Sequence, residues 1–172
     1  MTAKHHQPRF EALLGEHQKI VFKVASVYAH NLADRDDLAQ EICAQLWRSF
    51  AGYDVQRAKF STWMYRIALN VGISHVRRER GQAGRFEPLN EHHLETIGGG
   101  ESIPEPDERH TALYAFIGQL DALNRALILL YLEDRSYTEI ADILGISETN
   151  VATKINRIKQ KLRGQMTATA GA

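Results

Sequence analysis

The sequence predicts an all-α protein made of two small helical domains, which are joined by an acidic linker that contains glycine and proline. Three observations favour this fold class. Apolar residues recur at helical spacing in nearly every periodic segment, and no segment alternates convincingly as a strand does. The apolar fraction of 44% and the charged fraction of 24% are typical of a soluble globular protein. Between residues 81 and 108, three consecutive glycines, three prolines and several acids interrupt the periodicity.

The first domain, residues 1–80, is predicted to contain three helices. The first covers about residues 10–30, and Val21, Val24 and Tyr28 are among its apolar positions. The second follows an acidic turn, ADRDD, and continues through LAQEICAQLWRSF until Gly52 ends it. A polar loop, GYDVQRAK, leads to the third. The acids before the second helix either complement its dipole or form a contact surface for a basic partner, and charge alone does not decide between these.

The third predicted helix, residues 60–80, has the sequence FSTWMYRIALNVGISHVRRER and divides into two faces. Its core face recurs at three- and four-residue steps and consists of Tyr65, Ala68, Leu69, Gly72, Ile73 and Val76. The other face consists of Trp63, Ile67, Asn70, Ser74, Arg77 and Arg78. An indole beside amide, hydroxyl and guanidinium groups suits the stacking of unpaired bases. The pattern equally allows Trp63 to pack against the preceding loop.

The second domain, residues 109–165, is predicted to contain a helix-turn-helix. A helix that begins near residue 109 and a helix over NRALILLYLE come first. Ser136 and Glu139 then form a capping box, which predicts a helix start at Ser136. Gly145 is a typical helix stop, and Ser147 can cap the helix that follows. Residues 166–172 are small and polar, which predicts a frayed tail.

The last predicted helix has a buried stripe and a polar face. The stripe consists of Val151, Ile155, Ile158 and Leu162. The opposite face consists of Thr149, Ala152, Thr153, Asn156, Arg157 and Gln160. Short and amide side chains can read base edges in a major groove, while neighbouring cations contact phosphates. A solvated helix face is the alternative interpretation, but the five Lys and Arg residues without an acid at 154–163 favour DNA.

The charge distribution supports a nucleic-acid partner although the formal net charge is zero. Residues 57–85 contain seven Lys or Arg residues and one acid, and residues 154–163 are also basic. Residues 86–108 contain seven acids and no Lys or Arg. Because local charge governs phosphate contacts, two basic patches are masked in the total by an acidic middle.

Other classes of protein are disfavoured. No apolar run approaches the roughly 20 residues that span a bilayer, and the first residues lack the apolar core of a secretory signal. Cys43 is the only cysteine, which excludes an internal disulfide and fits a cytoplasmic protein. No nucleophile–base arrangement is apparent, so no enzymatic activity is predicted. The residues that could suggest a metal site lack helical ligand spacing, so no metal or cofactor is predicted; they are His5, His6, His92, His93 and Glu95.

Three segments together resemble the extracytoplasmic-function (ECF) group of bacterial RNA polymerase sigma factors, over about residues 10–163. The segment DDLAQEICAQLWRSF resembles the polymerase-binding helix of that family. The third helix, FSTWMYRIALNVGISHVRRER, resembles its promoter −10 segment. The segment LDALNRALILLYLEDRSYTEIADILGISETNVATKINRIKQKLR resembles its −35-binding helix-turn-helix. The order and spacing of the three motifs make the resemblance specific.

The resemblance implies roles for individual residues. The core polymerase, through the clamp helices of its β′ subunit, would contact Asp37, Gln40, Glu41 and Trp47. The loop from residue 53 to residue 60 would hold a base flipped from the non-template strand. The −10 element would contact Tyr53, Lys59, Phe60, Trp63, Arg66, Asn70, Arg77, Arg78 and Arg80. The −35 element would contact Thr149, Asn150, Ala152, Thr153, Lys154, Asn156, Arg157 and Lys161. A basic residue is common in the family where this chain has Ala152, which leaves the −35 sequence open.

The resemblance also implies partners: core polymerase through the β′ clamp helices and the β flap, promoter DNA, and an anti-sigma factor. The expected function is promoter-specific initiation of transcription, with recognition of −35 duplex DNA and melting and capture of the −10 element. The alternative is a helix-turn-helix regulator that acts without core polymerase. That alternative explains residues 136–163 but leaves the aromatic and basic third helix unexplained.

Overall fold

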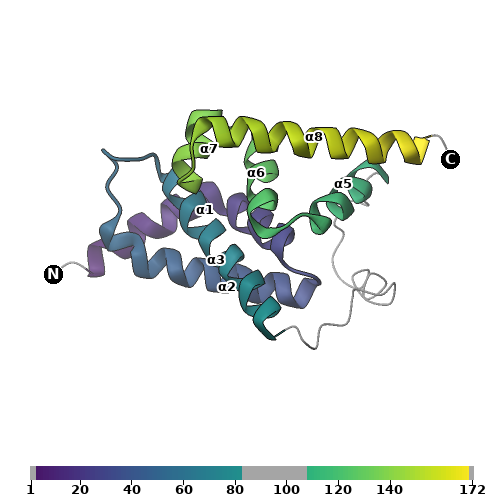
Figure 1. The fold of residues 1–172 in the computed structure, drawn as a ribbon. Coiled ribbons are helices and arrows are strands. Elements are labelled where there is room, and N and C mark those ends of the chain that lie inside the picture. The colour runs from purple at the N-terminus through teal and green to yellow at the C-terminus, as the bar shows by residue number, and fades with distance from the viewer. Residues whose placement is uncertain (1–2, 83–107, 171–172) are drawn as a thin grey trace. The chain divides into compact units, whose positions relative to one another are not determined.

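The structure is a computed structural model that describes residues 3–82 and 108–170, with side chains at residues 7–80 and 112–165. Within these ranges every regular element is a helix, which confirms the predicted all-α fold (Figure 1). The chain forms two compact units, one at residues 1–102 and one at residues 103–172. The predicted linker, residues 81–108, lies outside the described residues except at its two ends. Its bounds, and those of the flanking domains, stay a prediction.

The first unit is a bundle of three helices that pack on one another (Figure 1). These are α1 (Ala3–Tyr28), α2 (Leu32–Ser49) and α3 (Phe60–Gln82), and a 3-10 turn, η1 (Phe50–Gly52), follows α2. The core face predicted for α3 is confirmed except at Ile73, which is only half-buried; the buried members are Tyr65, Ala68, Leu69, Gly72 and Val76. At Gly72 the helix passes close to the ring of Tyr28 on α1. Packing in the bundle therefore fixes the position of α3 and leaves the face opposite its core face at the surface.

Two helix boundaries in the first unit differ from the prediction. Helix α1 begins at Ala3 and has non-helical backbone angles at His17, where its axis changes direction. Helix α2 begins at Leu32, so the segment ADRDD is helical and is not a preceding turn. The reason is a cap: the Asn31 side chain accepts a hydrogen bond of 2.8 Å from the Asp34 backbone N–H. An acid in the first turn of a helix is favourable, which explains why the run of acids does not break α2.

The second unit contains α5 (Glu108–Gln119), α6 (Ala122–Leu132), α7 (Tyr137–Leu144) and α8 (Glu148–Ala170). Helices α7 and α8 form the predicted helix-turn-helix. The side chain of Ser136 caps α7 at Glu139, and that of Ser147 caps α8 at Asn150, each at 3.1 Å. Gly145 ends α7 with a φ of 70°, a left-handed conformation that favours glycine. The three predicted capping residues are confirmed.

The predicted frayed tail is wrong as far as residue 170, because α8 continues to Ala170. Gly164 does not end the helix, since it is neither in a left-handed conformation nor followed by proline. A hydrogen bond of 3.2 Å joins Gln165 of α8 to Gln119 of α5. At Gln165, α8 is therefore joined to α5 of its own unit.

Candidate nucleic-acid interface

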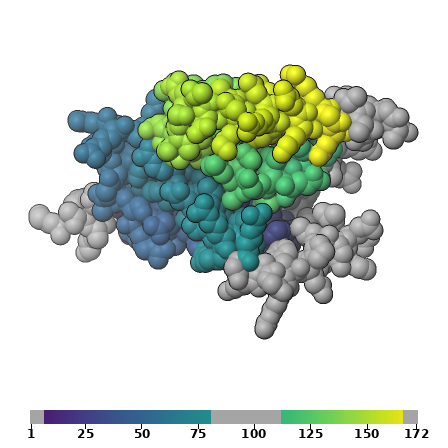
Figure 2. Space-filling view, in the orientation of Figure 1, coloured from purple at the N-terminus to yellow at the C-terminus, as the bar shows by residue number. Residues whose placement is uncertain are grey.

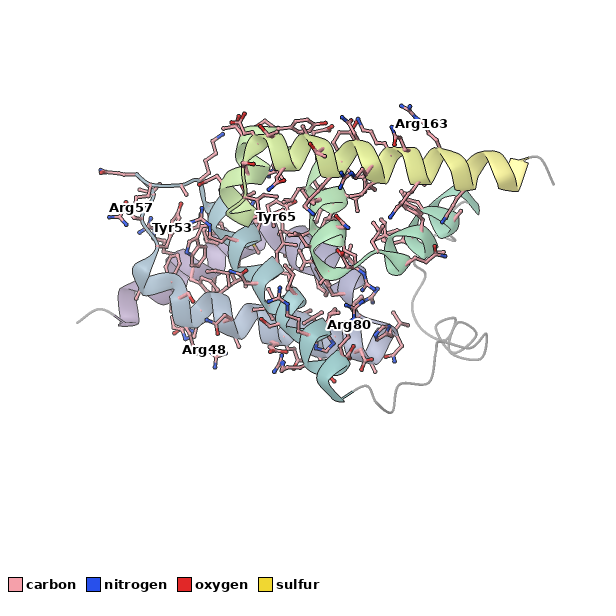
Figure 3. The ribbon with its side chains drawn as sticks, viewed as in Figure 1. Arg48, Tyr53, Arg57, Tyr65, Arg80 and Arg163 are labelled. Atoms are coloured by element: carbon pink, nitrogen blue, oxygen red, sulfur yellow. The ribbon has the colours of Figure 1, made fainter. Side chains whose placement is uncertain are left out.

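The loop between η1 and α3, residues 53–59, is closed by its own hydrogen bonds. The Tyr53 hydroxyl donates to the Ala58 carbonyl oxygen across the loop at 3.1 Å. The Asp54 carboxylate accepts from the Gln56 backbone N–H at 2.9 Å, an Asx turn. The Asp54 carbonyl oxygen accepts from the Arg57 backbone N–H at 3.1 Å. A compact turn results, from which Arg57 projects into solvent (Figure 3).

Six aromatic rings meet where this loop, η1, the end of α2 and the starts of α1 and α3 come together; we call them the aromatic cluster. The members are Phe10, Trp47, Phe50, Tyr53, Phe60 and Trp63. The rings of Trp63 and Tyr53 have centroids 5.0 Å apart, so Trp63 does pack against the preceding loop. The indole nevertheless stays half-exposed. Packing and exposure therefore coexist in Trp63, and its remaining surface is free for a partner.

The predicted −10 residues form two groups: aromatic residues held within the aromatic cluster, and residues with polar side chains on the loop and on α3. Phe60 is buried, and Tyr53 is held by ring contacts and by its hydrogen bond to Ala58. Both residues therefore support the loop and the other rings of the cluster. Lys59 is exposed. Along α3, Arg66 is half-buried, and the remaining predicted residues are exposed: Asn70, Arg77, Arg78 and Arg80.

The C-terminal end of α3 is joined to the rest of the bundle by side-chain contacts with α2 and with the turn before it. Glu79 lies between two histidines, with 3.0 Å from one carboxylate oxygen to His30 Nε2 and 3.0 Å from the other to His75 Nε2. His30 belongs to the turn between α1 and α2, so this contact joins two elements. The Arg78 Nη2 donates to the Glu41 Oε1 of α2 at 2.7 Å. These contacts therefore fix the position of the basic C-terminal end of α3 on the bundle.

The outer face of α2 carries the residues predicted to contact polymerase. Asp37 and Gln40 are exposed, and Glu41 is half-buried beside Arg78. The Trp47 indole keeps 41% of its surface exposed although one side lies against the Phe10 ring. Tryptophan is enriched in protein–protein interfaces relative to the rest of the surface, so the exposed indole suits a contact surface. Cys43 is half-buried on the same helix, and burial raises the pKa of its thiol.

The recognition face of α8 lies at the surface of the second unit (Figure 2). Ala152 and Lys154 are half-buried, and the other residues predicted to contact the −35 element are exposed: Thr149, Asn150, Thr153, Asn156, Arg157 and Lys161. On the opposite side Val151, Ile155 and Ile158 are buried, as the periodicity predicts. The two-sided character of α8 is therefore confirmed, except that Leu162 of the predicted stripe is only half-buried.

One cation of the basic run is used inside the unit. The Lys159 ammonium lies over the Tyr131 ring of α6, 4.3 Å from its centroid, in a cation–π contact. A hydrogen bond with the Tyr131 side chain raises the pKa of Lys159. Arg163 is exposed and projects outward from α8 (Figure 3). The sequence does not distinguish Lys159 from the other cations of the run. Its contact with Tyr131 is evident only from the packing of α6 on α8.

The candidate metal ligands lie beyond the part of the chain whose side chains the structure describes; these are His5, His6, His92, His93 and Glu95. Among the described residues, no group of three or more His, Cys, Asp or Glu side chains is arranged to hold a metal ion. None of the described helices is both long and apolar enough to cross a membrane.

Two family models match the chain, in the order of its two units. The model of sigma-70 region 2 matches residues 13–82, and the model of sigma-70 region 4 matches residues 110–162. The chain is 32% identical to the ECF RNA polymerase sigma factor SigE of Mycolicibacterium smegmatis over 91% of its own length, and it spans 61% of that protein. It is 24% identical to the ECF RNA polymerase sigma factor SigW of Bacillus subtilis, covering 95% of this chain and 91% of SigW.

A solved structure has the same fold. The sigma factor RpoE of Bartonella quintana, in complex with the anti-sigma factor NepR, superposes with a TM-score of 0.69 at 15% identity. The superposition covers 96% of this chain and 98% of RpoE. The region 2 match contains α2 and α3, and the region 4 match contains the helix-turn-helix. The chain therefore belongs to the sigma-70 family of RNA polymerase sigma factors, in the ECF group.

Proposed function

We propose that this chain binds core RNA polymerase in the cytoplasm and directs promoter-specific initiation of transcription. One observation carries the proposal: a region 2 bundle whose α3 carries a half-buried tryptophan and exposed arginines occurs in one chain with a region 4 helix-turn-helix whose polar face on α8 is largely exposed. The chain would act by binding, without a cofactor and without a catalytic step of its own. In this proposal residues 1–80 are the polymerase and −10 domain, and residues 109–165 are the −35 domain.

The two DNA surfaces would perform different steps. Helix α8 would enter the major groove of the −35 duplex, where Asn156 and Arg157 reach base edges and phosphates. The outer face of α3 and the closed loop would capture bases of the opened −10 element. Unstacking costs a few kcal/mol for each base, so a surface that binds unpaired bases offsets part of the cost of melting. The half-exposed Trp63 provides such a stacking surface.

The protein partners follow from the family and from the exposed face of α2. Core polymerase would dock its β′ clamp helices on Asp37, Gln40, Glu41 and Trp47, and its β flap would contact the second unit. Bartonella quintana RpoE was solved bound to an anti-sigma factor, which supports a partner of that kind for this chain.

Reconstituted transcription tests the proposal. Core polymerase with this chain should initiate at defined sites on genomic fragments, and core polymerase alone should not. The start sites should share upstream sequences at −10 and −35. The alternative, a regulator that acts without polymerase, predicts duplex binding by the chain and no co-purification with core polymerase. Failure of the inhibitor-free chain to bind core polymerase would contradict the sigma-factor proposal.

Asn156→Ala should weaken binding to the −35 duplex by about 1–3 kcal/mol, the value of a good bidentate contact between an amide and a base. Binding to a scrambled duplex should hardly change, because Asn156 would read bases and not phosphates. Fluorescence anisotropy with both duplexes measures the difference. Lys161→Gln is the matched control on the same helix: it should weaken both duplexes alike and lower the salt slope by about 1. Equal losses on both duplexes for Asn156→Ala would contradict base reading.

Glu41→Gln should tighten binding of the free chain to a −10 non-template single strand by up to about fivefold. Arg78, a predicted DNA contact, and Glu41, a predicted polymerase contact, form an ion pair of 2.7 Å. DNA that binds Arg78 must therefore displace Glu41, and polymerase that binds Glu41 must displace Arg78. A half-exposed pair of this kind is worth about 0–1 kcal/mol, which sets the size of the effect. The gain should vanish in an Arg78→Gln background. A gain that persists there would show that Glu41 acts through general repulsion of the strand.

A further inference from the structure

Phe10 lies behind the exposed tryptophan of the polymerase-facing surface. Its ring centroid is 5.3 Å from that of Trp47 and 5.1 Å from that of Phe50, and only 6% of Phe10 is exposed. The ring therefore contacts the inner side of the Trp47 indole and leaves the outer side, with 41% of the residue exposed, to solvent. Phe10 itself has almost no surface for a partner.

Phe50 connects the same ring to the second tryptophan. Its centroid is 6.1 Å from that of Trp63 and 6.0 Å from that of Tyr53. Trp63 also contacts Tyr53 at 5.0 Å and Phe60 at 5.4 Å. Trp47 and Trp63, which face the two proposed partners, thus rest on one continuous group of rings, and Phe10 is the member supplied by α1.

The break in α1 places Phe10 there. The backbone leaves the helical region at His17, with a φ of −119° and a ψ of 15°, so the segment before it runs in a new direction. The His17 ring lies 5.4 Å from the Phe60 ring, which fixes the break against the start of α3. The region 2 model begins at residue 13, so Phe10 lies outside the matched segment.

We infer that Phe10 is a positioning residue for both partner surfaces, acting directly on Trp47 and through Phe50 on Trp63. The inference rests on the proposed function. An indole already held in one orientation loses less side-chain freedom when a partner binds it. Removing the support should therefore weaken each interface without removing any contact that the partner makes. For Trp47, the cost of ordering one large side chain corresponds to a loss of about two- to tenfold in affinity for core polymerase.

Tryptophan fluorescence separates this role from a merely structural one, because the chain contains only two tryptophans. In Trp63→Phe and Trp47→Phe backgrounds each indole is observed alone. Phe10→Ala should increase acrylamide quenching of Trp47 strongly and of Trp63 less, since one ring intervenes. Ile20→Ala is the matched control, because Ile20 lies on the same helix, is equally buried and contributes no ring. It should lower stability but leave both quenching constants unchanged.

Function is then measured in the full chain with both tryptophans, at a temperature at which circular dichroism shows every variant to be folded. Phe10→Ala should bind core polymerase two- to tenfold more weakly than Ile20→Ala, and Phe10→Tyr, which keeps the ring, should restore wild-type affinity. Phe10→Leu keeps most of the buried volume and should show the same pattern, smaller in size, even if the alanine variant unfolds. Quenching and affinity equal to those of Ile20→Ala in both variants would overturn the inference. Failure of the wild-type chain to bind polymerase would instead overturn the proposed function.

Discussion

Gly72→Ala is expected to destabilise the first unit by about 2 kcal/mol, although alanine is the better helix former. A Cβ at this position would lie 2.5 Å from Cδ2, 2.9 Å from Cε2 and 3.0 Å from Cγ of Tyr28. The Tyr28 ring is completely buried between α1 and α3, so it has no free space into which to move. Overpacking of a core costs about 1–3 kcal/mol, and contacts this short belong at the upper end. The helix-propensity gain of about 1 kcal/mol offsets only part of that cost.

Gly15→Ala is the matched control for this prediction. Gly15 also lies within a helix of the first unit, but a Cβ there would meet nothing within 4 Å. The substitution should therefore stabilise the unit by up to about 1 kcal/mol. Urea denaturation followed by circular dichroism measures both variants. If both substitutions stabilise the protein, the close approach of α3 to Tyr28 is wrong.

The close approach also has a functional consequence. Shifting α3 away from α1 would move the exposed Asn70 and the arginines at its end relative to the closed loop. In the proposed function those groups contact one DNA strand together, so the −10 surface is expected to lose affinity in Gly72→Ala even under conditions in which the unit stays folded. The sequence places Gly72 on the core face of α3, but only the structure shows which ring it faces.

Local chemistry explains why much of the fold could be predicted from the sequence. The caps at Ser136 and Ser147 and the stop at Gly145 depend on residues within one turn of each helix, and all three are confirmed. The start of α2 differs from the prediction because a run of acids is also typical of a turn. The deciding residue was Asn31, whose side chain caps the helix ahead of those acids.

The candidate site could be predicted only in part, for a physical reason. Periodicity determines which side of a helix faces outward, so the exposure of Asn70 and Asn156 follows from their position in the repeat. Periodicity carries no information about which helices meet. The contact between Arg78 and Glu41 spans 37 residues of sequence, and that between Lys159 and Tyr131 joins separate helices. The same holds for Phe10, which the repeat marks as apolar without indicating that it supports Trp47.

Ile155→Ala is expected to destabilise the second unit by about 2–5 kcal/mol. Ile155 is completely buried on the inner side of α8, as are Ile140 of α7 and Leu127 of α6 in their helices. Truncation leaves a cavity where α8 packs against those two helices, and a unit of four helices has little stability in reserve. The orientation of the recognition helix depends on this packing, so specific binding to the −35 duplex should be lost with it.

The first unit should be unaffected by Ile155→Ala, because the two units have separate cores. Binding to core polymerase through the proposed β′ clamp contact of the first unit should therefore persist, weakened only by loss of the proposed β flap contact of the second unit. Denaturation should show two transitions, of which only one is shifted. Gln160→Ala is the control, since Gln160 is exposed on α8 and its loss should change stability by less than about 0.5 kcal/mol. Loss of polymerase binding, together with a denaturation curve that contains one transition only, would show that the two units fold as one. Retained polymerase binding without −35 recognition would instead assign −35 recognition to the second unit and the β′ clamp contact to the first.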